Sequence, residues 1–273
     1  MAEIDHIVAG HYTSGTLLAR IEAGLAARGV SLAQASAADL KPVDEFHIGG
    51  LTATEALLEQ IPLTAGMQAL DIGCGIGGTA RLLAGRGLDV DGVDITPEFV
   101  ETAQHLAGLL DLPGRFAIAN ALDLPFANDR FDLVTMLHVG MNIPDKPRLF
   151  AEAARVLRMG GMFAVYDVMR DEDGPIAYPL PWASAPEGSY LAPPGAYSFA
   201  AAAAGFSVQA TRPRGDFARA FFARLTAQID QSGAPPVGLP LIMGADAPVK
   251  IANMVRNLED RRYQPVEMIL RKG

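Results

Sequence analysis

Cysteine is almost absent from this sequence, since Cys74 is the only one in 273 residues. A framework of disulfides is therefore excluded, and a reducing, cytoplasmic location is expected. No apolar run reaches the roughly 18 residues of a membrane-spanning helix, and residues 1–5 lack the basic and apolar regions of a signal peptide. No membrane partner is expected. Histidine, cysteine and carboxylate residues nowhere show the spacing of metal ligands, so we also expect no metal.

Basic residues are also in short supply, because 22 Lys and Arg are set against 31 Asp and Glu, for a net charge of −9. A nucleic-acid partner would call for a basic surface, so the composition favours a small-molecule substrate. Half of the residues are hydrophobic, and a chain of this length can bury one large core. We therefore expect a single domain over residues 1–273, and the composition leaves its oligomeric state open.

The chain is organised around residues 67–78, where an apolar strand, a glycine turn and a helix start follow one another. Glycines at 73, 75, 77 and 78 allow positive φ angles and let a ligand lie against the main chain. The spacing also fits a dinucleotide fingerprint, but a pyrophosphate favours nearby cations, and residues 62–80 contain no Lys or Arg. Their one charge is Asp71, which suits a cationic ligand such as S-adenosylmethionine (SAM) and would repel NAD.

A second carboxylate, Asp94, ends the next predicted strand, 19 residues after Gly75. An acidic side chain at the tip of this strand can accept hydrogen bonds from both hydroxyls of a ribose. Asp94 can also cap the helix expected to begin near Thr96 and Pro97, and the two roles are compatible. Together with Asp71, this residue predicts a SAM site.

In combination, five short motifs resemble those of the class I SAM-dependent methyltransferases, and the resemblance runs over nearly all of the chain. LDIGCGIGG (70–78) is similar to the first motif of that family and GVDIT (92–96) to the second. The later motifs resemble three further segments: ALDLPF (121–126), RFDLV (130–134) and RVLRMGG (155–161).

Four other segments resemble a bacterial subgroup described as sarcosine/dimethylglycine or phosphoethanolamine-type N-methyltransferases. These segments are EFHIGG (45–50), HVGMNIPDK (138–146), YDVM (166–169) and YPLPWA (178–183). The resemblance implies methyl transfer from SAM, which becomes S-adenosylhomocysteine, to a small-molecule acceptor, with an amine nitrogen as the favoured atom. Methylation of oxygen or carbon is the alternative. A catalytically silent SAM-binding protein and a Rossmann dehydrogenase also remain open.

Apolar and amphipathic segments alternate between residues 67 and 167, which predicts parallel strands joined by helices. Strands are expected near 67–71, 89–93, 115–118, 131–136 and 162–167, and helices near 78–86, 97–109 and 146–158. Within this region, Met159-Gly160-Gly161 is expected to end a helix. Before it, the pattern predicts helices within 14–28 and 53–60 and an irregular stretch at 31–48. After it, helices are expected at 198–204, 215–231 and 244–261, and strands at 206–211 and 266–270.

The fold class that follows is α/β: a Rossmann-like, mostly parallel sheet of seven strands with helices on both faces. We expect a helical N-terminal lid over residues 1–60 and a SAM-binding core over 61–212. Residues 213–273 should form a helical insertion followed by the last strand. Ligands of such sheets bind at the carboxyl ends of the strands, where Asp71 and Asp94 are expected to lie.

The cofactor site is expected to draw on the lid, the glycine loop and the ends of the next strands. At Asn120 the family usually carries an aspartate that accepts a bond from the adenine amino group, and an amide oxygen can still accept that bond. The predicted cofactor residues are Tyr12, His47, Gly49, Asp71, Gly73, Cys74, Gly75, Asp94, Ile95, Asn120, Ala121, Leu122 and Leu137.

The predicted acceptor site contains His138 and Asn142, which follow the fourth strand of the core. His138 is the candidate base that removes a proton from the acceptor, and Asn142 is the candidate orienting amide. His138 can also be a simple wall residue. Asp167, Tyr178 and Trp182 are the other predicted substrate residues. Trp182, the only tryptophan, lies in a proline-rich loop and can equally be a packing anchor.

Overall fold

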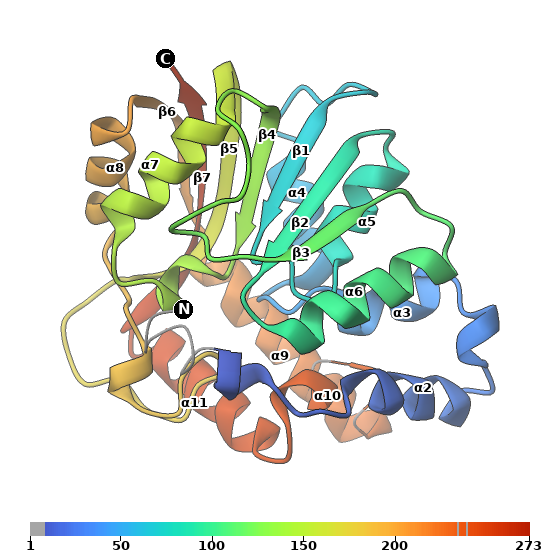
Figure 1. Cartoon of the computed structure of the whole chain (residues 1–273). Helices are drawn as coiled ribbons and strands as arrows, with labels where there is room; N and C mark the ends of the chain where they lie inside the picture. Colours follow the sequence, from blue (N-terminus) through green and yellow to red (C-terminus); the bar gives the residue numbers. More distant parts are fainter. Residues whose placement is uncertain (1–8, 234, 239) are drawn as a thin grey trace.

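A computed structural model describes residues 9–233, 235–238 and 240–273 (Figure 1). Its centre is a seven-stranded sheet with the strand order β3-β2-β1-β4-β5-β7-β6. Neighbouring strands from β3 to β5 are parallel, whereas β7 is antiparallel to both β5 and β6. The predicted fold class, a mostly parallel seven-stranded sheet surrounded by helices, is confirmed.

The strands fall where the apolar segments predicted them, with extensions at their ends. They are β1 (Gln68–Ile72), β2 (Asp89–Asp94), β3 (Arg115–Ile118), β4 (Phe131–Leu137), β5 (Leu157–Arg170), β6 (Phe206–Pro213) and β7 (Tyr263–Lys272). The helices are α2 (Leu17–Ala27), α3 (Ala37–Asp44), α4 (Gly50–Leu58), α5 (Gly78–Gly85), α6 (Pro97–Leu109), α7 (Lys146–Val156), α8 (Pro194–Ala203), α9 (Gly215–Ser232), α10 (Pro240–Met243) and α11 (Ala247–Glu259). Short 3-10 turns are η1 (Leu32–Gln34), η2 (Gly140–Asn142) and η3 (Pro186–Gly188).

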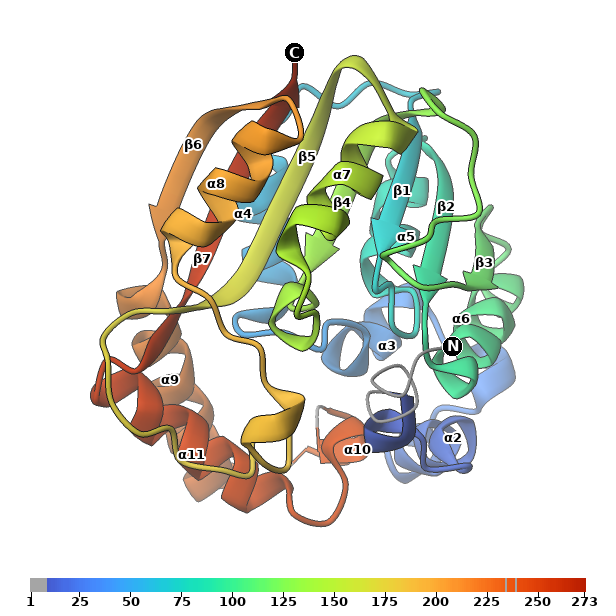
Figure 2. The ribbon, with the colours of Figure 1, turned by 60° about the vertical axis from the view of Figure 1, so that its left-hand side comes forward.

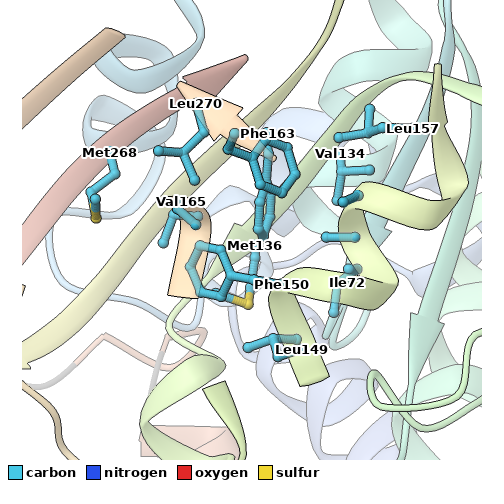
Figure 3. Close-up of a cluster of buried hydrophobic side chains, with 14 of the residues drawn as sticks. Ile72, Val134, Met136, Leu149, Phe150, Leu157, Phe163, Val165, Met268 and Leu270 are labelled. Atoms are coloured by element: carbon cyan, nitrogen blue, oxygen red, sulfur yellow. The ribbon is translucent and has the colours of Figure 1, made fainter. Parts of the chain in front are cut away.

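Alternate residues of each strand pack on opposite faces of the sheet, because successive side chains of a strand point to opposite sides. On one face, Phe163 and Val165 of β5 pack with Phe150 of α7, as Figure 3 shows. On the other face, Tyr166 of β5 joins Leu83 of α5 in a second buried cluster. The sheet is therefore covered by helices on both sides, as predicted.

The parallel strands direct their carboxyl ends toward the same edge of the sheet, the lower edge in Figure 1. Helices α2 and α3 from the N-terminal segment and α9 to α11 from the C-terminal segment gather at this edge (Figure 2). Leu25 of α2 packs in one buried cluster with Phe99 of α6 and Ile242 of α10. Segments from the two ends of the chain thus enclose the edge where ligands of such sheets bind.

Two local predictions were wrong. Residues 31–48 are not irregular, because they contain η1 and α3, and α3 begins with a capping box in which Asp39 accepts a hydrogen bond from Ser36 N at 3.0 Å. Residues 159–161 do not end a helix. Helix α7 ends at Val156, and the next residues belong to β5, where the register against β4 shifts and Gly160 has φ +78°.

The predicted helical insertion before the last strand is confirmed, with α9, α10 and α11 between β6 and β7. The helix expected near 244–261 is α11, and the short α10, which was not predicted, precedes it and is separated from it by a turn at Gly244, which has φ +86°. No helix in the described ranges is both long and apolar enough to cross a membrane.

Candidate active site

The glycine loop between β1 and α5 needs its glycines for two different reasons. At Gly73, with φ +69°, an added Cβ would lie 2.2 Å from Val139 Cγ2, so the loop and the segment after β4 approach too closely for a side chain. At Gly75, with φ +52°, an added Cβ would meet no protein atom within 4 Å. Gly75 therefore leaves an open space beside the main chain.

Asp94, at the end of β2, connects the glycine loop to the start of α6. Its Oδ2 accepts a hydrogen bond from Gly75 N at 3.0 Å, and its Oδ1 accepts one from Thr96 N at 2.9 Å. The carboxylate thus holds the loop in place and lies beside the first turn of the helix. It also lines the cavity in front of the loop, so the capping role and a ligand-binding role coincide in one residue.

The first cavity lies in front of the glycine loop, at the carboxyl ends of β1, β2 and β4, and has a volume of about 220 Å³. Its charged lining residues are all acidic: Asp44, Glu45, Asp71 and Asp94. Among the described residues that line it there is no Lys or Arg. Such a wall attracts a cationic ligand and gives no charge partner to a phosphate.

Asp71 is the most deeply placed of these carboxylates. Its side chain is buried, and its Oδ1 accepts a hydrogen bond from Thr135 Oγ1 of β4 at 2.7 Å. Burial raises the pKa of Asp71 to about 7, and the bond from Thr135 opposes that rise. A cation bound in the cavity would keep this carboxylate ionised at neutral pH.

All of the predicted cofactor residues except Gly49 line the first cavity. Asn120 lies in the loop after β3, where its Oδ1 accepts a hydrogen bond from Leu122 N at 2.8 Å. From the lid come Tyr12 and His47, and the Tyr12 ring contacts Phe46 edge-on at 6.1 Å between centroids. The lid segment and the core therefore share one cavity.

A second cavity, with a volume of about 450 Å³, lies between the lid, the proline-rich loop and helices α9 and α11. Tyr12, His47 and His138 line both cavities, as do the two neighbouring lid residues Glu45 and Phe46. The two cavities therefore meet at the end of β4. Trp182 lines the second cavity, and its Nε1 also donates to Ser189 Oγ at 3.0 Å.

His138 lies at this junction, immediately after β4. It has φ +55°, an unusual value for a residue with a side chain, and its backbone N–H donates to Tyr166 O at 2.7 Å. Its Nε2 is buried and has no hydrogen-bond partner among the described residues. Burial, reinforced by the nearby His47, lowers the pKa of His138 well below its usual value. The ring is thus a neutral imidazole whose buried Nε2 has unsatisfied hydrogen-bonding capacity.

His47 faces His138 from the lid, with 5.7 Å between ring centroids. Its Nε2 lies 3.0 Å from Thr54 Oγ1, and Thr54 in turn donates to Glu45 Oε2 at 2.8 Å. Burial lowers the pKa of His47 to about 4, although a backbone contact with Gly50 opposes this. Two neutral imidazoles and a buried carboxylate therefore surround the junction between the cavities.

Three predicted residues lie outside both cavities. Gly49 is needed for packing, because an added Cβ would lie 2.3 Å from Phe217 Cε1. Asp167 is fully buried, and its carboxylate accepts a hydrogen bond from Tyr197 Oη at 2.6 Å. It lies inside β5, which continues to Arg170, and its side chain points to the face opposite that of Tyr166. Tyr178 packs in the apolar cluster around Trp182 instead of facing a ligand.

Most of the wall of the second cavity is formed by residues that were not predicted from the sequence. Helix α9 contributes Phe221, Phe222, Leu225 and Ile229, whose spacing places them on one helical face. That apolar stripe was visible in the sequence, but nothing in the sequence indicated what it faces. Across the described part of the chain, no group of three or more His, Cys, Asp or Glu is arranged to hold a metal ion.

Comparison with known families decides the nature of the core. Residues 70–165, which carry β1 to β5, match the family described as "Methyltransferase domain". This segment is therefore similar in sequence to a methyltransferase domain. The glycine loop and His138 lie within the matched segment, whereas the acidic cavity is also lined by residues outside it, such as Tyr12 and Glu45.

Curated relatives of the methyltransferase domain differ in the atom that they methylate. Methyltransferase GfsG of Streptomyces halstedii is 34% identical over 134 residues, which cover 48% of this chain and 48% of that protein. Others are named as O-, C- and N-methyltransferases. The chain spans about half, or less, of the length of the curated relatives it matches.

Solved structures share the fold over more of the chain. A putative sarcosine dimethylglycine methyltransferase from Galdieria sulphuraria has a TM-score of 0.66 at 22% identity and covers 82% of this chain and 86% of that one. Phosphoethanolamine N-methyltransferase 2 of Haemonchus contortus, in complex with S-adenosyl-L-methionine, has a TM-score of 0.77 at 18% identity, covering 100% of this chain and 60% of that one. At these identities the likeness shows that the chain shares the Rossmann-like fold of these proteins.

Proposed function

We propose that this protein is a SAM-dependent methyltransferase that acts on a small molecule. The observation that carries the proposal is the acidic wall of the first cavity, because SAM has an ammonium and a sulfonium and no phosphate. A dinucleotide would place a pyrophosphate against a wall without a cation, which disfavours a dehydrogenase. The overall acidity of the chain and its single cysteine support a metabolite substrate in the cytoplasm, with no nucleic-acid partner.

The residues that would hold SAM fit its parts. The open main chain at Gly75 leaves room for the ligand, and Asp94 offers carboxylate oxygens to ribose hydroxyls. Asp71, buried beneath the loop, offers a negative charge to a cation, and Asn120 retains an amide that can hydrogen-bond the adenine. The lid residues Tyr12 and His47 would close over the bound cofactor.

Methyl transfer needs positioning more than acid–base chemistry. SAM supplies a methyl group whose bond to sulfur breaks as the lone pair of the acceptor forms the new bond. The enclosed junction between the cavities holds the acceptor in line and excludes water. If the acceptor carries a proton, the unpaired Nε2 of His138 is the group placed to accept it. Asn142, which is buried on η2 and lines the first cavity, would orient the acceptor.

An amine nitrogen remains our predicted acceptor atom. The buried carboxylate of Glu45 lines both cavities and would favour the positive charge that a methylated tertiary amine acquires. Oxygen and carbon acceptors remain alternatives, since relatives of each kind occur. Transfer of a labelled methyl group to a panel of amines, phenols and activated carbons tests this choice, and no transfer to any acceptor would favour a silent SAM-binding protein.

The Asp94→Asn variant tests the cofactor site. It keeps the size of the side chain and removes its charge, so SAM affinity should fall by about 1–1.5 kcal/mol, or roughly fivefold to tenfold. Calorimetric titration with SAM measures this. Asp89→Asn is the matched control, because Asp89 is an ion-paired carboxylate at the opposite end of β2. If the two variants bind SAM with equal affinity, Asp94 does not contact the cofactor.

A second prediction concerns the lid, which we expect to open when a ligand enters, because Tyr12 and His47 line the first cavity. Glu98 of α6 holds the start of α2, since its carboxylate accepts from Gly15 N at 2.9 Å and Leu17 N at 2.7 Å. Added SAM should therefore slow proteolysis within residues 9–50, and Glu98→Gln should accelerate it. Mass spectrometry of the fragments gives both rates.

The control for the lid is Glu101→Gln, on the exposed side of the same helix. Its cleavage should match that of the unmodified protein. If SAM leaves the cleavage rate within residues 9–50 unchanged, this segment does not act as a lid. The prediction also named residues 1–8, which lie outside the described part of the chain.

A further inference from the structure

We infer that the second cavity holds the methyl acceptor and that this acceptor is an uncharged, mainly hydrocarbon molecule with one polar nucleophilic group. The inference rests on the proposed function and adds the substrate class to it. It follows from the lining of the cavity, its size, and the single polar end at which it meets the cofactor cavity. It differs from the small charged amines that the sequence resemblance suggested.

The interior wall is formed by large apolar side chains from several elements. Phe222 and Leu225 come from one face of α9, Met254 from α11, Met141 from η2 and Trp182 from the proline-rich loop. The volume of about 450 Å³ lies in the range of pockets that enclose an organic ligand much larger than an amino acid. A wall of this kind stabilises a ligand chiefly by removing hydrocarbon surface from water.

Charge is confined to the ends of the cavity. Apart from histidine and tyrosine, the described residues that line the cavity include three ionisable ones: Arg28, Lys41 and Glu45. Arg28 and Lys41 are exposed, and Arg28 is paired with Asp39 at 3.5 Å, so neither charge lies in the apolar interior. A carboxylate or phosphate placed among the aromatic and methionine side chains would lose its hydration without gaining a partner.

The polar end of the cavity is the junction with the cofactor site. There the buried Nε2 of His138 has no hydrogen-bond partner among the described residues, and the His138 ring lies 5.7 Å from the His47 ring and 5.0 Å from the Tyr166 ring, centroid to centroid. A buried polar atom of this kind gains free energy from a ligand that satisfies it. The acceptor therefore lies with its nucleophilic group at His138 and its hydrocarbon part toward Trp182 and α9.

Trp182 provides a direct readout, because it is the only tryptophan in the sequence and it lines the cavity. Its emission can be followed with S-adenosylhomocysteine present, so that ligands bind without turnover. The probes form matched pairs that share a nucleophile: para-butyl-N-methylaniline with sarcosine, and para-butylphenol with para-hydroxybenzoate. Phosphoethanolamine serves as the phosphate probe. The apolar member of each pair should bind roughly tenfold to a hundredfold more tightly, given the hydrocarbon that it buries.

A pair of variants on α9 locates the binding site. Leu225→Asp places a carboxylate on the cavity wall, whereas Thr226→Asp places the same charge on the exposed side of the helix. We expect Leu225→Asp to weaken binding of para-butylphenol by at least about tenfold and Thr226→Asp to leave it unchanged. SAM affinity, measured by calorimetry, should be the same in both and shows that each variant is folded.

The outcomes separate this inference from the proposed function. Tight SAM binding together with preference for sarcosine, para-hydroxybenzoate or phosphoethanolamine would overturn the apolar acceptor and leave the methyltransferase intact. Equal effects of Leu225→Asp and Thr226→Asp on para-butylphenol would show that it binds elsewhere and would also overturn the inference. Failure of SAM to bind the unmodified protein would instead reject the proposed function.

Discussion

Gly75→Val should eliminate measurable SAM binding while the protein remains folded. An added Cβ at this position meets no protein atom within 4 Å, so the side chain would project into the space assigned to the ligand. Because the backbone has φ +52°, a residue with a side chain also costs about 1–2 kcal/mol in the free energy of unfolding. Calorimetry with SAM measures the binding, and thermal unfolding measures the stability.

Gly66→Val separates the two effects of this substitution. Gly66 lies in the turn before β1, has φ +85°, has equally empty surroundings and lines neither cavity. The Gly66 variant should therefore lose a similar amount of stability and bind SAM normally. If the Gly75 variant binds SAM as tightly as this control does, the glycine loop is not the cofactor site.

His138→Asn should lower the rate of methyl transfer by roughly tenfold to a hundredfold at neutral pH, which is moderate acid–base help. Asparagine is chosen because it tolerates the left-handed backbone at this position better than alanine does. The exposed His105 of α6, which lines neither cavity, gives the control variant His105→Asn. Initial rates at saturating SAM measure the effect.

The pH dependence distinguishes the acceptor atoms. Since burial lowers the pKa of His138 well below its usual value, the imidazole is already neutral at neutral pH and gains nothing from a higher pH. In the His138→Asn variant, a higher pH should partly restore the rate with an alkylamine acceptor, because more of the amine is then in the uncharged, nucleophilic form that the second cavity is inferred to hold. A loss of several thousandfold without such recovery would contradict an amine acceptor and indicate an alcohol, which a moderately higher pH does not deprotonate.

The sheet was predictable because its strands are short apolar runs separated by glycine turns and amphipathic helices. Strand positions such as 67–71 and 89–93 needed only this local pattern, and so did the glycine loop and Asp94. Helix α3 was missed because it is short, polar on average and contains Pro42, which weakens a helical pattern. Its position depends on tertiary contacts, including the ion pair between Asp44 and the buried Arg81 of α5.

Candidate site residues were predictable where they directly follow a strand, whereas Asp167, Gly49 and Tyr178 depended on the packing around them. Asp167 was expected at the end of its strand, but β5 continues to Arg170, and the period of two then directs the Asp167 side chain away from the cavities. The second cavity could not be predicted at all. It exists only because α9 and α11 meet the lid and the loop around Trp182, and a single apolar stripe does not identify its partner.

The chain leaves the sheet at β6 and returns to it at β7, its immediate neighbour, so helices α9 to α11 form a closed excursion between two adjacent strands. The sheet requires only that the two ends of this excursion meet, and lengthening a closed segment costs little, about 0.6 kcal/mol for each doubling. The excursion can therefore diverge in length and sequence while the glycine loop and its strands stay the same. A protein built in this way can exchange one acceptor for another during evolution without rebuilding its cofactor site.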